Sequence, residues 1–358
     1  MSSETSFGND WSGELAITGL GLITPVGLRA EASLAALRAG VSRLSRLSQL
    51  VVQVDENEMD LVIGAEAPIE TERRMITDRI FLLMEPALKE VFSSADLGKD
   101  DRIGAYIGTP GASPGGRMLN YDEYYKENFL RIVPKEFRIE QARLVPAGRV
   151  SVLKAIRYAA DALEKGVIDV AVIGASDSWI NPRSLNWLKK TGRVNEYPAK
   201  TGTLPSEAAA FLTLEKPERV RERGREVYAF LKSSAGRFEE GNWGDPMNAI
   251  PLTHCIRSVT GDVQDEDAFV ISDLCGERYR AMEWVMALPK AMWDYQNLYH
   301  WHPAECIGDS GSAMGAITLA WAAEAMRKQY NPSPNSLVWG ASDEGYREAA
   351  LVSAFRDK

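Results

Sequence analysis

Few side chains in this sequence could form a covalent intermediate. Cys306 lies three residues before Asp309 and is a candidate nucleophile. Cys275 lies two residues after Asp273, and a neighbouring carboxylate disfavours a thiolate. A buried cysteine is more often an ordinary core residue than a reactive one. Of the two cysteines, Cys306 is therefore the fallback candidate for a nucleophile.

Two histidines, His300 and His302, have the look of a metal-binding pair. They stand two residues apart in an expected loop, without a third ligand nearby, whereas a zinc site uses three or four protein ligands. We expect them to be surface residues, and we expect the protein to hold neither a metal nor another cofactor.

A charged residue stands where a turn leads into an apolar helix. The turn at 145–148 reads VPAG, Arg149 follows it, and a helix is expected at 151–165. A guanidinium stays protonated in proteins and cannot carry an acyl group. Ser151 offers a hydroxyl two residues later, but a serine nucleophile needs a nearby base.

The elements that would position these residues alternate between strands and helices. Apolar runs predict strands at 14–18, 102–108, 167–174, 268–272 and, last in the chain, 336–339, and helical spacing predicts helices at about 30–39, 73–94, 151–165, 250–259, 276–288 and 312–326. This alternation is typical of parallel sheets flanked by helices. Residues 208–215 and 227–235 are expected to be adjacent strands, and 117–145 to be a long covering segment.

A short string occurs twice in similar surroundings. GASD stands at 174–177 and again at 340–343, each time after a strand that itself follows a helix containing an Ala-Ile pair. The shared order of elements favours an internal duplication over two unrelated turns.

Composition limits the class of protein. The 358 residues carry a net charge of −9, which argues against nucleic acid or an anionic membrane as a partner. Three cysteines without CxxC spacing, and no leader or long apolar segment, predict a cytoplasmic protein. A basic patch for an acidic partner could exist around Arg219, Arg221, Arg223 and Arg225, although such a run is usually a solvated face.

Five segments, in this order, carry a resemblance to a known family. They are ELAITGLGLITPVG, DRIGAYIGTPGASPGG, VAVIGASDSWINPRSL, LPSEAAAFLTLEKPERVRERG and IGDSGSAMGAITLAWAAEAM. Together they resemble the β-ketoacyl synthase branch of the thiolase superfamily over most of residues 14–350. The resemblance implies an α/β thiolase fold with duplicated βαβ halves in five layers (αβαβα). We expect a disordered tail at 1–12, a first half at 13–215 and a second half at 216–358.

The same resemblance implies that the catalytic residues of the family are replaced. Arg149 stands at the position of the nucleophilic cysteine, Asp273 and Asp309 at those of the two histidines, and Ala304 at that of the lysine. The closing glycine loop of the family corresponds to 340–343, which has lost its gating aromatic residue.

If the scaffold is intact, these replacements meet in one pocket. Arg149, Asp273 and Asp309 would converge there, with Glu277 and Asp343 close by. We expect a buried cluster in which two anions and one cation satisfy each other's hydrogen bonds. The alternative is a polar ligand pocket in which Arg149 binds a carboxylate or a phosphate.

The sequence thus predicts a ketosynthase-like protein without Claisen condensation activity, acting as a binding or adaptor subunit. It would form a homodimer, or a heterodimer with an active synthase, and an acyl carrier protein is a further candidate partner. The alternative is an acyltransferase that handles carrier-bound or coenzyme-A-bound acyl groups through a residue such as Cys306.

Overall fold

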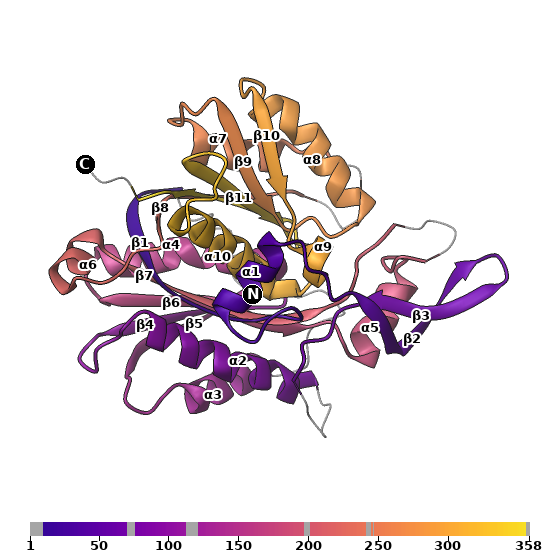
Figure 1. Cartoon of the computed structure of the whole chain (residues 1–358), viewed down its shortest axis with the longest axis horizontal. Coiled ribbons are helices and arrows are strands. Elements are labelled where there is room, and N and C mark those ends of the chain that lie inside the picture. Colours follow the sequence, from indigo (N-terminus) through magenta and orange to yellow (C-terminus); the bar gives the residue numbers. More distant parts are fainter. Residues whose placement is uncertain are drawn as a thin grey trace.

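The computed structural model describes residues 10–69, 76–111, 121–196, 201–240, 245 and 247–355. Ten strands form the main sheet, and Figure 1 shows that it folds into two stacked layers. In sheet order the strands are β10 (Asn297–Trp301), β9 (Asp267–Ser272), β11 (Asn335–Ala341), β12 (Tyr346–Ser353), β8 (Ala229–Phe238), β1 (Trp11–Ile23), β7 (Glu207–Glu215), β6 (Val170–Ser178), β4 (Ile103–Thr109) and β5 (Ile139–Pro146).

The two halves of the chain build their layers in the same way. In chain order, the strands of the first half in this sheet are β1, β4, β5, β6 and β7, and those of the second half are β8 to β12. When they are numbered one to five within each half, both layers have the spatial order third, second, fourth, fifth, first. Pairing directions also agree, because the second strand is parallel to the third and fourth, and the fifth is antiparallel to the fourth and first. This shared topology confirms the internal duplication that the repeated GASD string predicts. The fifth strand of the first half ends at Glu215 and the first strand of the second half begins at Ala229.

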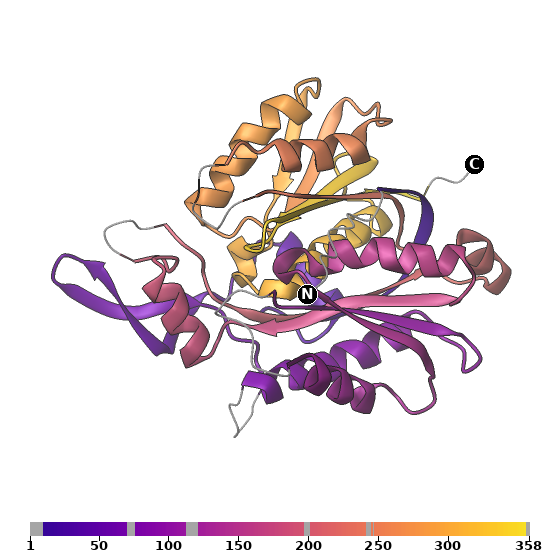
Figure 2. The same cartoon turned by 180° about the vertical axis from the view of Figure 1, so that it is seen from behind.

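Some helices lie between the layers and others cover the outer faces (Figures 1 and 2). The inner pair is α4 (Ser151–Glu164) and α10 (Met314–Arg327); the outer helices are α2 (Ile76–Ser94) and α3 (Tyr121–Ile132) on the first half, and α7 (Ile250–Thr260) and α8 (Arg278–Ala291) on the second. Every residue of α10 from Met314 to Met326 is buried. A helix that is apolar on all sides requires this central position. The five layers are those of the thiolase fold.

β1 belongs to both layers. Its first part pairs with β8 from Trp11 to Ile17, and its second part pairs with β7 from Ala16 to Ile23. The expectation that β7 and β8 are adjacent is therefore wrong, because β1 lies between them. Of the tail expected at 1–12, residues 1–9 lie outside the described part of the chain, whereas Trp11 and Ser12 already pair with β8.

Several stretches contain more regular structure than the sequence predicts, among them 45–64, 182–190 and 297–301, where His300 lies in a strand and not in the expected loop. Within the covering segment expected at 117–145, α3 and β5 form, and β5 is an edge strand of the main sheet. α3 buries little apolar surface, mainly Tyr125 and Phe129 one turn apart, so its periodicity is weak. Near the other end, β12 follows β11, so 336–339 is not the last strand. The charged residues Arg347 and Glu348 interrupt the apolar pattern by which β12 could be recognised in the sequence, although both side chains are buried.

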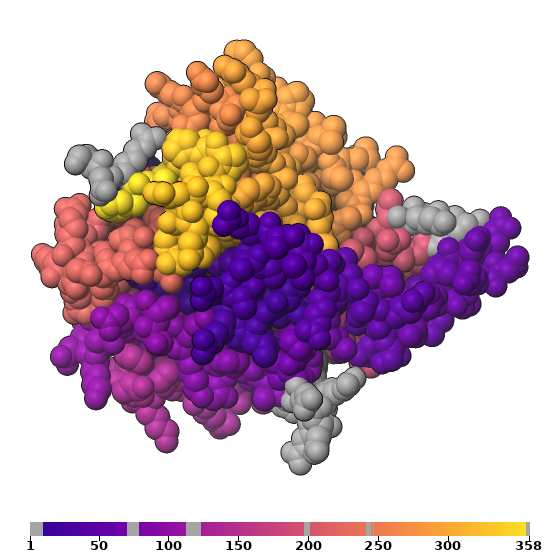
Figure 3. Space-filling model, in the orientation of Figure 1, coloured from indigo at the N-terminus to yellow at the C-terminus, as the bar shows by residue number. Residues whose placement is uncertain are grey.

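The remaining elements lie around the two layers. They are α1 (Ala30–Arg38), α5 (Pro182–Lys190), α6 (Pro217–Arg223), α9 (Ala304–Ile307) and the hairpin of β2 (Ser45–Asp55) and β3 (Glu58–Gly64). The hairpin extends from one side of the molecule (Figures 1 and 3). A two-stranded hairpin is marginal alone, and this one packs Leu47, Val52 and Val62 in a cluster with Leu185 and Leu188 of α5.

We expect Gly21→Ala to destabilise the fold by about 1–3 kcal/mol through overpacking. A Cβ at this position would lie 2.0 Å from the Ala87 carbonyl oxygen and 2.7 Å from the Val91 nitrogen, so β1 and α2 would have to separate. Chemical denaturation measures the change. Gly98→Ala is the control, because its Cβ would meet no atom closer than 3.5 Å. Equal stability of the two variants would contradict the close approach of β1 to α2.

Candidate functional site

The site is centred on Arg149, at the start of the inner helix of the first half. The chain leaves β5 and turns at Gly148, which has a φ of 55° that favours glycine. The short 3₁₀ turn η1 (Gly148–Val150) then leads directly into α4. The side chain of Arg149 is 4% exposed, so its charge needs partners within the protein.

Asp309 is the bidentate partner of Arg149. The Nε atom of Arg149 donates to Oδ1 of Asp309 at 3.0 Å, and Nη2 donates to Oδ2. The other acceptor positions of Asp309 receive the Thr203 hydroxyl at 2.9 Å and the Gly311 backbone N–H at 3.0 Å. Asp309 thus joins α4 to the turn before α10, and its carboxylate is fully buried and fully hydrogen-bonded.

Glu277 binds three arginines at once. Its Oε2 accepts from Arg149 Nη1 at 3.2 Å, Arg193 Nη2 at 2.9 Å and Arg280 Nε at 3.0 Å, and its Oε1 accepts from Arg193 Nε at 2.6 Å. Burial alone would raise the pKa of Glu277, but the charges of Arg149, Arg193 and Arg280 outweigh it and lower the pKa to about 2. Glu277 therefore stays ionised.

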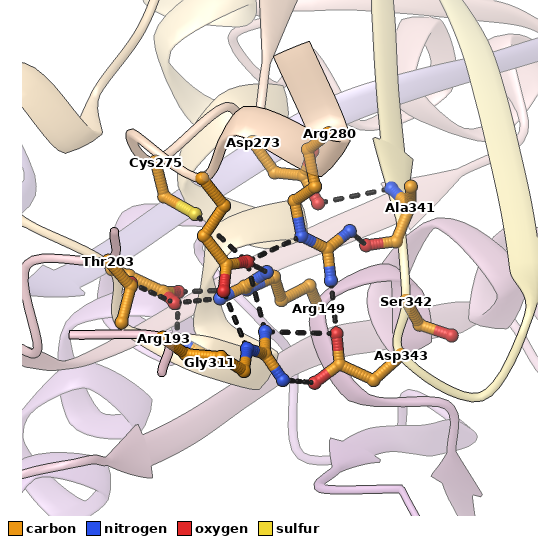
Figure 4. Close-up of polar contacts among 12 residues, drawn as sticks. Arg149, Arg193, Thr203, Asp273, Cys275, Arg280, Gly311, Ala341, Ser342 and Asp343 are labelled. Carbon is orange, nitrogen blue, oxygen red and sulfur yellow. Dashed lines mark hydrogen bonds and ion pairs between the residues drawn. The ribbon is translucent and has the colours of Figure 1, made fainter. Parts of the chain in front are cut away.

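Asp343 completes the network at its more open side. Arg193 donates to its two oxygens at 2.5 and 3.2 Å, and Arg280 also donates to Oδ1. Burial opposes ionisation of Asp343, yet these arginines hold its pKa well below the usual range. Figure 4 shows the resulting arginine–carboxylate network, in which three cations (Arg149, Arg193, Arg280) balance three anions (Glu277, Asp309, Asp343).

Asp273 lies beside this network rather than in it. Its Oδ2 accepts the Ala341 backbone N–H at 3.1 Å. Its Oδ1 is buried without a hydrogen-bond partner among the described residues. Burial raises the pKa of Asp273 to about 6, against the weaker effects of Arg280 and Arg149. The expectation that Asp273 pairs with Arg149 is therefore wrong: the carboxyl holds the end of β11 instead.

The two aspartates of the repeated GASD string both support the site. Asp343, from the second copy, binds Arg193 and Arg280, as described above. Asp177, from the first copy, accepts the Ser312 backbone N–H and hydroxyl, both at 2.9 Å. Asp177 lies near the end of β6 and Asp343 just after β11, so both stand at the carboxyl ends of equivalent strands of the two halves.

The structure brings together Arg149, Asp309, Glu277 and Asp343, as the sequence suggests, and adds Arg193 and Arg280. Charge balance could have indicated that further cations are needed, although not which ones, because one arginine cannot neutralise several buried carboxylates. Arg280 also stands one helical turn after Glu277. Arg193 gave no signal, because it lies in the connection after α5, far from the site in sequence.

The thiols near the site are poor nucleophiles. Cys306 is buried in the apolar core with Ala304, and burial raises the pKa of its thiol. Burial also raises the pKa of Cys275 to about 12. Since the thiolate is the reactive form, burial makes both cysteines weaker nucleophiles. The Ser151 hydroxyl is buried and has no hydrogen-bond partner among the described residues, so it lacks the base that a nucleophile needs.

The histidines lie apart from the site and are not surface residues. His300 and His302 both contact the Ser272 hydroxyl, at 2.8 and 3.2 Å, and burial lowers the pKa of His300 to about 3. The described residues contain no group of three or more His, Cys, Asp or Glu side chains that could hold a metal ion.

The arginine run at 219–225 does not form the basic patch considered above. Arg219, Arg223 and Arg225 all pair with the buried carboxylate of Asp101, and Arg225 also pairs with Glu215. Their charges are therefore largely neutralised within the protein. Among the described helices, none has the length and apolar character needed to span a membrane.

Comparisons with known proteins point to the ketosynthases. No family model matches the chain. A putative polyketide β-ketoacyl synthase 1 from Streptomyces halstedii is 27% identical over 270 residues, 63% of each chain. The oxytetracycline polyketide putative β-ketoacyl synthase 1 from Streptomyces rimosus is 31% identical over 148 residues, 35% of each. The matches thus span less than two thirds of these relatives' length.

Solved structures share the fold at low sequence identity. A type II polyketide ketosynthase in complex with its acyl-carrier protein gives a TM-score of 0.76 at 15% identity, over 96% of this chain and 100% of that chain. The ishigamide ketosynthase/chain length factor gives 0.75 at 15%, over 97% and 100%. A bacillaene synthase ketosynthase from Bacillus subtilis gives 0.76 at 13%, over 96% and 72%. The chain is a β-ketoacyl synthase-like protein with the thiolase fold.

We expect Arg149→Ala to destabilise the protein by roughly 3–5 kcal/mol, because it leaves buried Asp309 and Glu277 without a shared cation. Thermal and chemical denaturation measure the loss. Arg46→Ala removes the exposed ion pair with Asp60 and serves as the control, for which little change is expected. An unchanged melting temperature for Arg149→Ala would contradict a structural role for the network.

A second prediction concerns the pH dependence of stability. The pKa of Asp273 is about 6 in the folded protein and about 3.9 when unfolded. The folded state therefore binds the proton more tightly, and this contribution to stability is lost as pH rises from about 4 to about 6. Asp273→Asn, which mimics the protonated acid, should gain on the order of 2 kcal/mol over the wild type at neutral pH and little at pH 4.

Denaturation of both proteins at the two pH values tests this, because the other titrating groups are common to both and cancel in the difference. An equal difference in unfolding free energy at both pH values would show that Asp273 does not carry the shift.

Proposed function

We propose that the protein is a non-catalytic ketosynthase-like subunit that works through binding, either as an adaptor or as the inactive chain of a synthase pair. The observation that carries this proposal is the occupation of the expected nucleophile position by Arg149, with its guanidinium held by Asp309 and Glu277. Acyl transfer by a ketosynthase needs a thiolate at this position, with imidazoles beside it.

The network also occupies the space and the hydrogen bonds that a substrate would need. An acyl thioester would have to separate charges that now satisfy each other in a buried environment. The free-energy cost would be similar to the one expected for Arg149→Ala, which also breaks these ion pairs. Two of the three carboxylates, Glu277 and Asp309, are almost fully buried. A polar ligand pocket at Arg149 is therefore less favoured than a site rebuilt for cohesion.

A protein partner fits this role. The structural neighbours include a ketosynthase/chain length factor and a ketosynthase bound to its acyl-carrier protein. We propose that this chain likewise assembles with a second chain, a copy of itself or an active synthase. β5, at the end of the main sheet, offers an open edge for such pairing. A carrier protein would then bind the active partner, and the assembly would act in the cytoplasm.

The proposal predicts that the protein resists acylation. We expect intact-mass spectrometry after incubation with acetyl- and malonyl-coenzyme A to show the unmodified mass, while an active ketosynthase treated in parallel gains the acyl group. Cys306→Ser is the matched variant. An adduct on the wild type that disappears in Cys306→Ser would overturn the proposal in favour of an acyltransferase. A subunit role further predicts that the tagged chain, recovered from its native cells, carries a second chain that these thioesters acylate.

A further inference from the structure

An apolar stripe on the outer surface of α8 is unpartnered in the single chain. Met282, Val285 and Pro289 lie on one face at spacings of three and four residues, and Trp293 continues the stripe just beyond the helix. Their exposure is unusual for such residues: Met282 is 49% exposed, Val285 65% and Trp293 76%. Scattered apolar side chains on a surface need no explanation, but a continuous stripe of this size marks a contact surface.

The neighbouring helix of the same layer shows what an ordinary outer face looks like. α7 also packs on the second half of the sheet, and its exposed positions beyond the first residue are His254, Arg257 and Ser258. α8 instead exposes Met282 and Val285 along its middle, while its own inner face is already buried through Trp284 and Ala287. The stripe is therefore additional to what the fold requires of this helix.

Charges at the two ends of the stripe indicate what covers it. Arg278 stands at the amino end of α8 and Asp294 just after its carboxyl end, and both are exposed. Neither forms an ion pair within the described part of the chain. Opposite charges at opposite ends make the stripe complementary to itself when two copies run antiparallel.

We propose that a second copy of this chain docks on α8, with the two helices antiparallel about a twofold axis that passes between Val285 and Pro289. This arrangement places Met282 beside Trp293 of the second copy and Val285 opposite Pro289 of the second copy. Each Arg278 comes within a helical turn of Asp294 of the second copy, so both unpaired charges gain a partner. The contact is isologous, as in most homodimers.

The site and this surface are separate. α8 begins at the arginine–carboxylate network, but it lies in the outermost layer of the second half (Figure 1) and the stripe on it is exposed. The open edge of β5 belongs to the first half. Self-association through α8 therefore does not depend on the function of the site, and it is compatible with a second contact through β5.

Sedimentation equilibrium of the full chain over a wide concentration range tests the proposal. The wild type should reach twice the mass of Val285→Lys. In this variant each copy brings one lysine to the centre of the contact, where the two charges would lose their hydration and repel each other. Val167→Lys is the matched control, since Val167 is 47% exposed in the connection before β6, and its mass should equal that of the wild type. Melting temperatures of the variants report whether folding is intact.

A charge swap tests the orientation. Arg278→Asp should weaken self-association about tenfold, and the double variant Arg278→Asp with Asp294→Arg should restore it, because the swapped charges pair again across the axis. Equal masses for the wild type and Val285→Lys would overturn the proposal and assign the stripe to a different protein. Dissociation by Val285→Lys without rescue in the double variant would overturn the antiparallel arrangement.

Discussion

Charge neutrality in a buried space is the constraint on which this molecule depends. Three guanidinium groups and three carboxylates meet between the two halves, and each loses its hydration there. Removing water from one such ion costs several kcal/mol, so no member is stable without the others. The residues come from the start of α4, the connection after α5, the region before α8, the turn before α10 and the turn after β11. The network therefore fixes five segments of the chain relative to one another.

The network lies at the positions that the resemblance assigns to the family's catalytic residues. Here the same place in the fold holds ion pairs that join the amino end of α4 to the turn before α10. The geometry of the inner helices, the glycine turn at Gly148 and the duplicated sheets are retained. A scaffold that supports one chemistry can thus be stabilised by another set of interactions.

Much of the architecture could be predicted, because buried helices and strands leave long apolar runs. The inner helix α10 and the strands β4, β6 and β9 follow directly from such runs. α3, β5 and β12 could not be predicted, since edge elements and internally paired charges interrupt the pattern. At the site, the family resemblance pointed to Arg149, Asp309 and Asp343. Arg193 and the true partner of Asp273 are set by contacts between segments distant in sequence, which local patterns do not encode.

The position of β1 in both layers has a consequence for how the protein is made. Trp11 pairs with Ser234 and Ala16 with Glu215, so β1 is synthesised about 200 residues before its partner strands. At typical translation rates, on the order of 5–20 residues per second, this apolar strand waits roughly 10–40 s for its neighbours. Its edges are then open to incorrect pairing. Synthesis of this protein therefore includes an interval in which β1 has been made but β7 and β8, its partner strands, have not.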